Sequence, residues 1–308
     1  MLGRKLLSEQ VGDAPQRFHA LMGLRRYYLH RGRMQTAHEL GKRLIGLAHS
    51  MQDPVHLSRA HMLHQETLYC LGELEQIQRH CEEGLAAYDR QLSHPFNLVL
   101  ALYFDAFLHQ FRREAHAVEE RVEEVLQISL EQGFALYQAW GTILRGWSLA
   151  ERGKESDGIN QMCKGIAALR SLGVERTLPD SLASLARAYG KVGEIEKGLI
   201  LLAEALDLIS ETGERCWEAE LYRLKGELLL KQSETNRDID DAEVCFRRAI
   251  DVAHRQSAKS WELRAATSLS HLWQEQGKRD QAYGLLHGTY AWFQRATTRR
   301  SEEGPNAA

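Results

Sequence analysis

Apolar residues recur three and four positions apart along most of this chain, which is the pattern of helices with one buried face. The run Ile195, Leu199, Leu202, Leu206 and Ile209 is one example. Short polar segments separate these stretches, so the pattern predicts seven units, each with a first helix, a tight turn and a second helix. First helices are expected over 17–31, 55–71, 95–112, 134–152, 178–192, 215–232 and 258–276. Second helices are expected over 34–51, 74–90, 114–132, 155–172, 195–212, 239–256 and 279–295.

A small or short apolar residue returns once in each second helix, at intervals of 40, 41, 40, 40, 44 and 40 residues. These residues are Ala37, Ile77, Val118, Gly158, Gly198, Ala242 and Ala282. Five positions before each of them we expect the turn between the helices, at Gly32, Gly72, Arg113, Gly153, Gly193, Arg237 and Gly277. Small side chains let paired helices approach closely. A period of about 40 residues with two amphipathic helices is typical of an α-solenoid.

The domain boundaries follow from the same pattern. The one longer interval coincides with the polar segment 232–238, which we interpret as a lengthened turn because insertions in repeats usually lie in loops. We expect an N-terminal extension over 1–16 and one continuous repeat domain over 17–295. The segment 296–308 lacks an apolar face and is expected to be a disordered tail.

Composition is that of an ordinary soluble protein: 308 residues, 44% hydrophobic and 26% charged, with a formal net charge of −3. The charge is uneven, since residues 1–50 carry 9 Lys and Arg against 3 Asp and Glu. Solvated helix faces that differ between repeats explain this, and a basic end that docks an acidic partner is the alternative. We do not expect nucleic-acid binding, because one modestly basic end is weak evidence.

The five cysteines are odd in number, widely spaced and without a Cys-x-x-Cys pair, which argues against disulfides and a zinc ribbon. We expect reduced cysteines and a cytoplasmic location. No signal peptide is evident at the start. The longest apolar run, 98–104, is far too short for a membrane span, so no membrane association is expected.

Histidines gather in the first part of the chain, where 11 of the 14 lie at or before His116. His56, His61 and His64 share one expected first helix, and His61 and His64 have the spacing of two metal ligands on one helix face. No second helix offers an obvious matching pair. We therefore expect exposed polar side chains here, with no metal and no cofactor.

The order of turn glycine, small residue and, seven positions later, a second small residue such as Gly84 or Gly165 resembles the tetratricopeptide repeat (TPR), in a form longer than its usual 34 residues. Segments 214–230, 242–250 and 258–269 further resemble one group of bacterial signalling proteins. In that group a TPR region follows a P-loop ATPase module, with a class III adenylate or guanylate cyclase domain or a LuxR-type DNA-binding domain at the N-terminus. The resemblance implies an all-α fold, an α-solenoid of about seven TPR-like repeats in a right-handed superhelix.

Catalytic motifs are absent from the sequence. No segment matches the phosphate-binding G-x-x-x-x-G-K-[ST] pattern, and the paired aspartates of a cyclase are not found. The chain is therefore not expected to be an enzyme, and we assign no catalytic residue.

The TPR resemblance implies that first helices line a concave groove and bind a partner there. Carried onto this sequence, the groove positions are Tyr103, Phe107, Trp140, Trp147, Arg187, Arg223, Glu227, Arg264 and His271. Aromatic side chains beside arginines suit a peptide with apolar and acidic features. The alternative is that Trp140 and Trp147, which lie two turns apart on one helix face, belong to the core.

Two functions remain open. The first is a non-catalytic TPR scaffold that binds a protein or peptide partner, or senses a signal, in a bacterial system of the cyclase and ATPase type. The second is a small-ligand sensor whose concave face closes over an effector. A homodimer is compatible with either.

Overall fold

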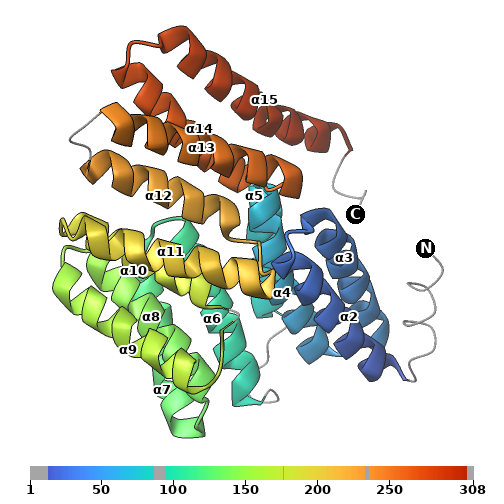
Figure 1. The fold of residues 1–308 in the computed structure, drawn as a ribbon. Helices are drawn as coiled ribbons and strands as arrows, with labels where there is room; N and C mark the ends of the chain where they lie inside the picture. The colour runs from blue at the N-terminus through green and yellow to red at the C-terminus, as the bar shows by residue number, and fades with distance from the viewer. Residues whose placement is uncertain (1–12, 87–93, 176, 233–235, 304–308) are drawn as a thin grey trace. The chain divides into compact units, whose positions relative to one another are not determined.

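The computed structural model describes residues 13–86, 94–175, 177–232 and 236–303, and every regular element in these ranges is an α-helix (Figure 1). These residues divide into two compact units, Met1–Cys216 and Trp217–Ala308, here called unit 1 and unit 2. Unit 1 contains α2 (Ala14–His30), α3 (Met34–Met51), α4 (Pro54–Leu71), α5 (Leu74–Ala86), α6 (Pro95–Phe111), α7 (Ala115–Gln132), α8 (Ala135–Glu151), α9 (Glu155–Ser171), α10 (Leu178–Lys191) and α11 (Ile195–Thr212). Unit 2 contains α12 (Glu218–Gln232), α13 (Asn236–Gln256), α14 (Lys259–Glu275) and α15 (Arg279–Glu303).

The helices are those that the apolar pattern predicts, and the prediction of an all-α, TPR-like solenoid is confirmed. Observed and expected ends agree within three residues at all but two helix ends. The expected end of α5 at 90 lies outside the described residues. One continuous repeat domain over 17–295 stays a prediction.

The expected turns are tight and left-handed. Gly32, Gly72, Gly153, Gly193 and Gly277 all have φ between 69° and 82°, and Arg113 has φ 61° in the same role. Only glycine adopts this conformation without steric cost, which explains its recurrence after first helices.

The prediction of a turn at Arg237 was wrong, because α13 already begins at Asn236. Asp238 in the first turn of α13 favours the helix there through its interaction with the helix dipole. The middle of the expected loop, 233–235, lies outside the described residues.

The small residues of the second helices lie where two helices touch. Ala37, Val118, Ala242 and Ala282 are fully buried, and Ile77 is 1% exposed. At Gly158, a Cβ atom would lie 2.5 Å from the carbonyl oxygen of Gly146 on α8. The helix backbones approach so closely that no side chain fits, as the repeat pattern predicts.

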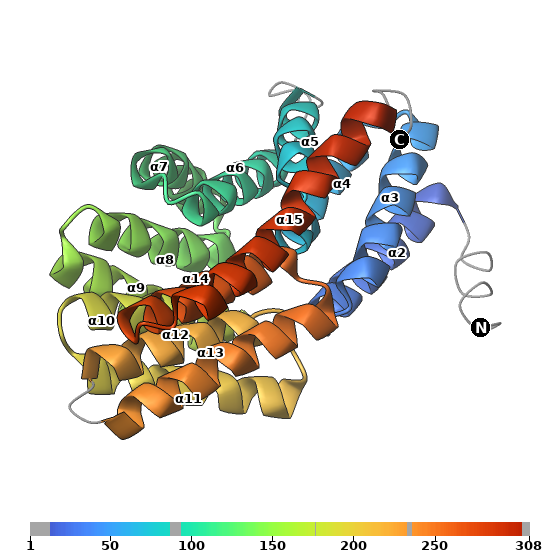
Figure 2. The ribbon, with the colours of Figure 1, turned by 90° about the horizontal axis from the view of Figure 1, so that it is seen from above.

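Unit 1 is a stack of five helical hairpins in chain order. The first helices α2, α4, α6, α8 and α10 contact one another in succession, and each second helix packs on its own first helix. In a curved stack the inner helices lie closest together, so the first helices form the inner layer and the second helices the outer layer. Figure 2 shows these hairpins following one another from blue to yellow.

The two ends of unit 1 meet. The backbone N–H of Arg215, which follows α11, donates to the carbonyl oxygen of His30 at the end of α2, at 2.5 Å. The Glu214 carboxylate lies 2.8 Å from His30 Nδ1. The five hairpins therefore curve back onto their own start, and their inner helices face a common interior (Figures 1 and 2).

Unit 2 consists of two hairpins, α12–α13 and α14–α15. Its core holds Ala242, Phe246, Leu269, Trp273 and Ala282, all at most 7% exposed. Helix α15 continues to Glu303, beyond the expected start of a disordered tail at 296. Alanine, arginine and glutamate in this stretch favour a helix even without an apolar face. Residues 304–308 lie outside the described part of the chain.

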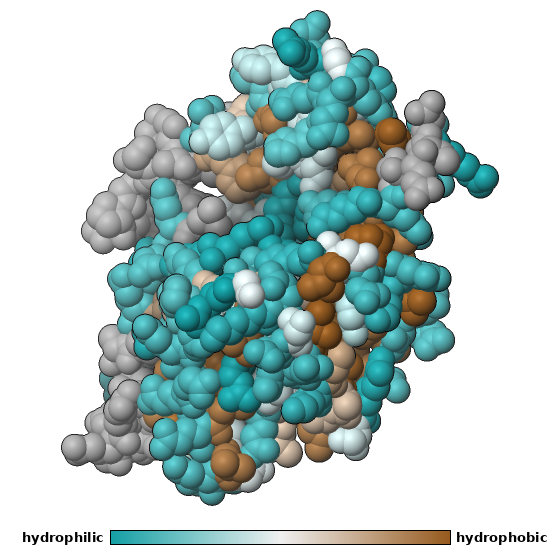
Figure 3. All heavy atoms as spheres, turned by 90° about the vertical axis from the view of Figure 1, so that its left-hand side faces the viewer, coloured by the Kyte–Doolittle hydropathy of each residue, from teal (hydrophilic) through white to brown (hydrophobic). Residues whose placement is uncertain are grey.

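Within the described residues, no helix combines the length and the apolar character that crossing a bilayer requires. The face of the molecule seen in Figure 3 is mostly hydrophilic, with hydrophobic residues showing in patches between the polar ones. The five cysteines all lie in the described part of the chain, where none forms a disulfide and four are buried.

Candidate functional site

A group of aromatic side chains in mutual contact lies on the inner helices α6 and α8 of unit 1. The Tyr103 ring stacks on Trp140, with ring centroids 5.2 Å apart, and on Phe107, at 6.0 Å. Tyr137 meets Tyr103 edge-on at 5.7 Å and Trp140 at 5.3 Å. We call Tyr103, Phe107, Tyr137 and Trp140 the aromatic face. The structure thus brings together three of the residues that the sequence assigns to a groove, and adds Tyr137.

The aromatic face is firmly held and only partly accessible. Phe107, Tyr137 and Trp140 are 7%, 6% and 9% exposed, whereas Tyr103 is half-buried. The indole Nε1 of Trp140 donates to Thr177 Oγ1 at 3.0 Å, which fixes the ring from the α10 side. Tyr103 therefore offers most of the accessible contact area, and the rings packed around it leave it little side-chain freedom to lose on binding.

Charged groups of both signs surround the aromatic face. Burial raises the pKa of Tyr103 well above its usual value, and the carboxylates of Asp180 and Glu66 raise it further. Burial raises the pKa of Tyr137 to about 12, while Arg26 and Arg59 lower it. These residues belong to α2, α4 and α10, so charge from three other inner helices reaches the rings of α6 and α8.

Asp180 is the carboxyl group with the most unusual environment. Burial raises its pKa to about 7, and the nearby Glu66 acts in the same direction. Its Oδ1 atom is inaccessible to solvent and has no hydrogen-bond partner. The inner layer of unit 1 therefore holds a carboxyl group that gives up its proton near neutral pH.

Two further predicted groove residues in unit 1 have structural partners. Trp147 is 4% exposed and so belongs mostly to the core. Arg187 forms an ion pair with Glu151 at 3.2 Å, and the same carboxylate holds Lys191 at 2.8 Å. Neither side chain adds to the aromatic face in the way that the repeat positions suggest.

Three of the four predicted groove residues of unit 2, Arg223, Glu227 and Arg264, join one hydrogen-bonded network between α12 and α14. Arg223, 4% exposed, holds both oxygens of Glu220 at 2.7 Å and also pairs with Glu227. Arg264 reaches the same Glu220 at 2.7 Å. The carboxylates raise the pKa of Arg223 despite its burial, so this guanidinium stays charged. His271, the last predicted residue, is exposed.

The histidines of α4 are not the exposed polar residues that the sequence suggested. His61 and His64 are 3% and 1% exposed, and α5 supplies the second helix that sequence reasoning did not find, with His80 7% exposed. Burial lowers the pKa of His61 to about 4 and that of His80 to about 3. The 19-residue separation of His61 and His80 gives no local spacing signal; only the hairpin register of α4 against α5 pairs them.

A hollow of about 440 Å³ lies on the α8–α9 hairpin. Its polar lining includes Gln138, Arg145, Gln161 and Lys164, and Arg145 Nη2 donates to Gln161 Oε1 at 2.9 Å. This volume is within the range of small-molecule sites.

No model of a known protein family matches the sequence. Among curated proteins, an uncharacterized protein of Rhizobium meliloti is 24% identical over 188 residues, which cover 61% of this chain. The match spans only 18% of that relative's length.

Solved structures show the class of fold. A Rap protein solved in complex with competence and sporulation factor is similar with a TM-score of 0.68 and 14% identity, over 92% of this chain and 77% of that chain. The apo form of RapI is similar with a TM-score of 0.59 and 11% identity, over 90% of this chain and 99% of that chain. Aspartyl phosphate phosphatase F from Bacillus subtilis is similar with a TM-score of 0.59 and 11% identity, over 94% of this chain and 73% of that chain. At these identities the likeness shows the TPR-like helical fold and carries no activity over.

Proposed function

We propose that this chain is a non-catalytic TPR scaffold whose unit 1 binds an extended segment of a protein partner on its inner layer. The observation that carries the proposal is the aromatic face, a preorganised cluster of four rings on neighbouring inner helices. Clustered aromatic residues with adjacent charges are the usual anchors of a binding surface. That a Rap protein of similar fold was solved with a bound factor supports the same use of the fold.

The partner segment is expected to carry apolar and basic side chains. The arginines assigned to the groove from the sequence, Arg187, Arg223 and Arg264, all hold carboxylates of this chain. An acidic peptide would have to displace those carboxylates. At Tyr103, the half-buried ring of the aromatic face, Asp180 and Glu66 outweigh Arg26 and would attract a lysine or arginine of the partner, whereas Arg26 and Arg59 act on the buried Tyr137.

A displayed library of random peptides tests this directly. Selection on the purified chain should enrich peptides that combine a large apolar residue with a basic one. Their binding should weaken at least tenfold in Tyr103→Ala and also in Glu66→Gln, which leaves the rings in place. Tyr283→Ala, which alters a 70% exposed ring in unit 2, is the control. Peptides that bind all three variants equally would contradict the proposal.

The signalling context belongs to the same proposal. Residues 214–230, 242–250 and 258–269 resemble TPR regions of bacterial cyclase and ATPase signalling proteins, and the Rhizobium relative is bacterial. We infer that the partner is a component of such a system and that the chain works in the cytoplasm, where its free thiols remain reduced. Purified chain should show neither cyclase nor nucleotide-hydrolysing activity; measurable turnover would overturn this assignment.

A small-ligand sensor is the second candidate, and the hollow on the α8–α9 hairpin favours it. A ligand that binds only the folded chain raises the apparent melting temperature. A metabolite panel should then yield a compound whose stabilising effect is lost in Lys164→Ala and kept in Tyr103→Ala. The absence of any stabilising compound would leave the peptide scaffold as the function.

A further inference from the structure

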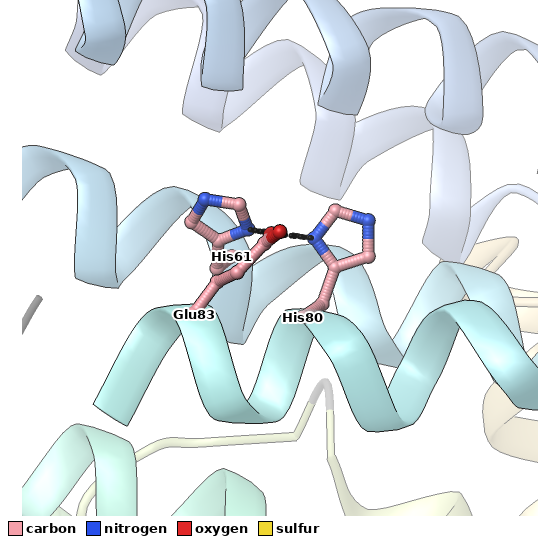
Figure 4. A group of neighbouring side chains, drawn as sticks. All are labelled: His61, His80 and Glu83. Carbon is pink, nitrogen blue, oxygen red and sulfur yellow. Dashed lines mark hydrogen bonds and ion pairs between the residues drawn. The ribbon is translucent and has the colours of Figure 1, made fainter. Parts of the chain in front are cut away.

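A group of three potential metal ligands lies inside the second hairpin of unit 1. It comprises His61 on α4 with His80 and Glu83 on α5, whose ligand atoms all lie within 4.8 Å of one another. His80 and Glu83 are one helical turn apart, so they share a face of α5 and oppose His61 (Figure 4). Both rings direct Nδ1 towards the same oxygen of Glu83 (Figure 4).

The distances between the three candidate ligand atoms are close to those found between the ligand atoms of a coordinated ion. His61 Nδ1 lies 2.6 Å from His80 Nδ1 and 3.2 Å from Glu83 Oε2, and His80 Nδ1 lies 3.8 Å from that oxygen. Zinc binds imidazole nitrogen and carboxylate oxygen at about 2.0–2.2 Å, so tetrahedral ligand atoms lie about 3.3 Å apart. The observed values scatter around this edge length, and adjustments below about 1 Å would equalise them.

Hydrogen bonds alone do not satisfy the two imidazole nitrogens and the carboxylate oxygen of this group. Both rings are buried and neutral, so each carries one N–H. Two Nδ1–H groups facing each other at 2.6 Å would clash, so at most one proton lies between two nitrogens and a carboxylate oxygen. Three electron-pair donors converging around one proton suit a divalent cation better.

The surroundings hold these groups in place. On one side of the pair, the Ser58 hydroxyl donates to the carbonyl oxygen of Gly84 at 2.7 Å, joining α4 to α5. On the other side His64 meets His80 edge-on, with ring centroids 5.3 Å apart. Glu83 is 46% exposed, which leaves an entry path for an ion from solvent.

We propose that His61, His80 and Glu83 form a binding site for one divalent first-row transition-metal ion, of which zinc is the representative. Two imidazoles and one carboxylate leave a fourth position for water or for a group of a partner. The ion would tie α4 to α5 within one hairpin of unit 1. The site involves none of the residues of the aromatic face.

Calorimetric titration with zinc chloride tests this on the full chain, prepared without added histidines and stripped of metal with a chelator. We expect saturation at one zinc ion per chain. Glu83→Gln, on the half-exposed side of the site, should weaken binding at least tenfold and His80→Ala should abolish it. Glu82→Gln, its exposed neighbour on α5, should bind as tightly as the wild type.

Cobalt gives a second readout that does not depend on the fold of any variant. Cobalt(II) bound by these residues in the wild-type chain should show the visible absorption of a tetrahedral ion, and added zinc should remove it. Circular dichroism of Glu83→Gln shows whether the fold is kept. Absence of saturable binding of either metal, or equal affinity in Glu83→Gln and the wild type, would overturn the proposal.

Discussion

Single atoms decide how closely the hairpins of this chain pack. At Gly158 an added Cβ would lie 2.5 Å from the carbonyl oxygen of Gly146 and 2.8 Å from the backbone nitrogen of Ala150. Both are backbone atoms, so the two helices would have to move apart. At Gly23 in α2, by contrast, a Cβ would meet nothing within 4 Å.

These two glycines give opposite predictions for the same substitution. Gly158→Ala should lower the free energy of unfolding by about 1–3 kcal/mol, because it overpacks a tight contact. Gly23→Ala should raise it by about 0.5–1 kcal/mol, because alanine loses less backbone entropy in a helix. Denaturant unfolding followed by circular dichroism measures both. Equal stability of Gly158→Ala and wild type would show that α8 and α9 need no close approach.

Asp180 makes stability depend on pH. Its pKa is about 7 in the folded chain against 3.8 ordinarily, owing to burial and to Glu66. The folded chain therefore binds more protons than the unfolded chain between about pH 4 and pH 7, and the free energy of unfolding falls as the pH rises through this window. The other titratable groups on which it acts are Tyr103 and Cys216.

Asp180→Asn, which cannot ionise, should remove the part of the fall in unfolding free energy that Asp180 causes as the pH rises. We expect it to exceed the wild type in stability by more than about 1 kcal/mol at pH 8, with the difference shrinking towards pH 4. Denaturant unfolding at both pH values measures it, and Asp207→Asn on an exposed face of α11 is the control. Parallel pH profiles of Asp180→Asn and wild type would contradict the proposed environment.

At the scale of helices, a buried polar network joins α12 to α14 inside unit 2. Glu220, 6% exposed, accepts hydrogen bonds from the guanidinium groups of Arg223 and Arg264. Removing one partner of a buried ion pair leaves an uncompensated charge. The network therefore fixes how two first helices pack together.

Glu220→Ala should destabilise unit 2 by about 3 kcal/mol, since it removes two hydrogen bonds from the buried Arg223 and leaves it Glu227 as a carboxylate partner. The pair of Arg247, which is 57% exposed, and the less exposed Glu243 is the comparison within the same unit, and Arg247→Ala should cost about 1 kcal/mol. Unfolding curves of the three proteins decide the matter. A loss below 1 kcal/mol in Glu220→Ala would mean that packing alone holds α12 against α14.

The elements were largely predictable because their signals are local. Apolar periodicity, turn glycines and prolines at helix starts place α3, α4 and α10 within a residue of their observed bounds. The errors lie where the local signal weakens. Arg237 was predicted as a turn from the regular repeat spacing, which the longer repeat does not follow. The end of α15 was predicted where its apolar stripe ends, but the helix continues to Glu303.

The sites were less predictable because they depend on which helices meet. Tyr103, Phe107 and Trp140, predicted from their repeat positions, do lie together, whereas no repeat position pointed to Tyr137 and Trp147 lies mostly in the core. The charges around the rings come from four other positions, on α2, α4 and α10, that no spacing connects. The pairing of His61 with His80 likewise follows from hairpin register alone.

At the scale of the molecule, the chain consists of two compact units of TPR-like hairpins. Unit 1 curves until the residues after α11 meet the end of α2, so its inner helices face one another. This arrangement concentrates aromatic and charged side chains on one inner surface, which is the property that a peptide-binding scaffold requires. The proposed metal site lies within a single hairpin of that unit and would stabilise it locally.

Hydrogen–deuterium exchange with a selected peptide bound tests the central proposal most directly. We expect the peptide to slow exchange in the inner helices α6, α8 and α10 of unit 1, and we expect little change in α7 and α9 of the outer layer. Slower exchange confined to the outer helices or to unit 2 would contradict it.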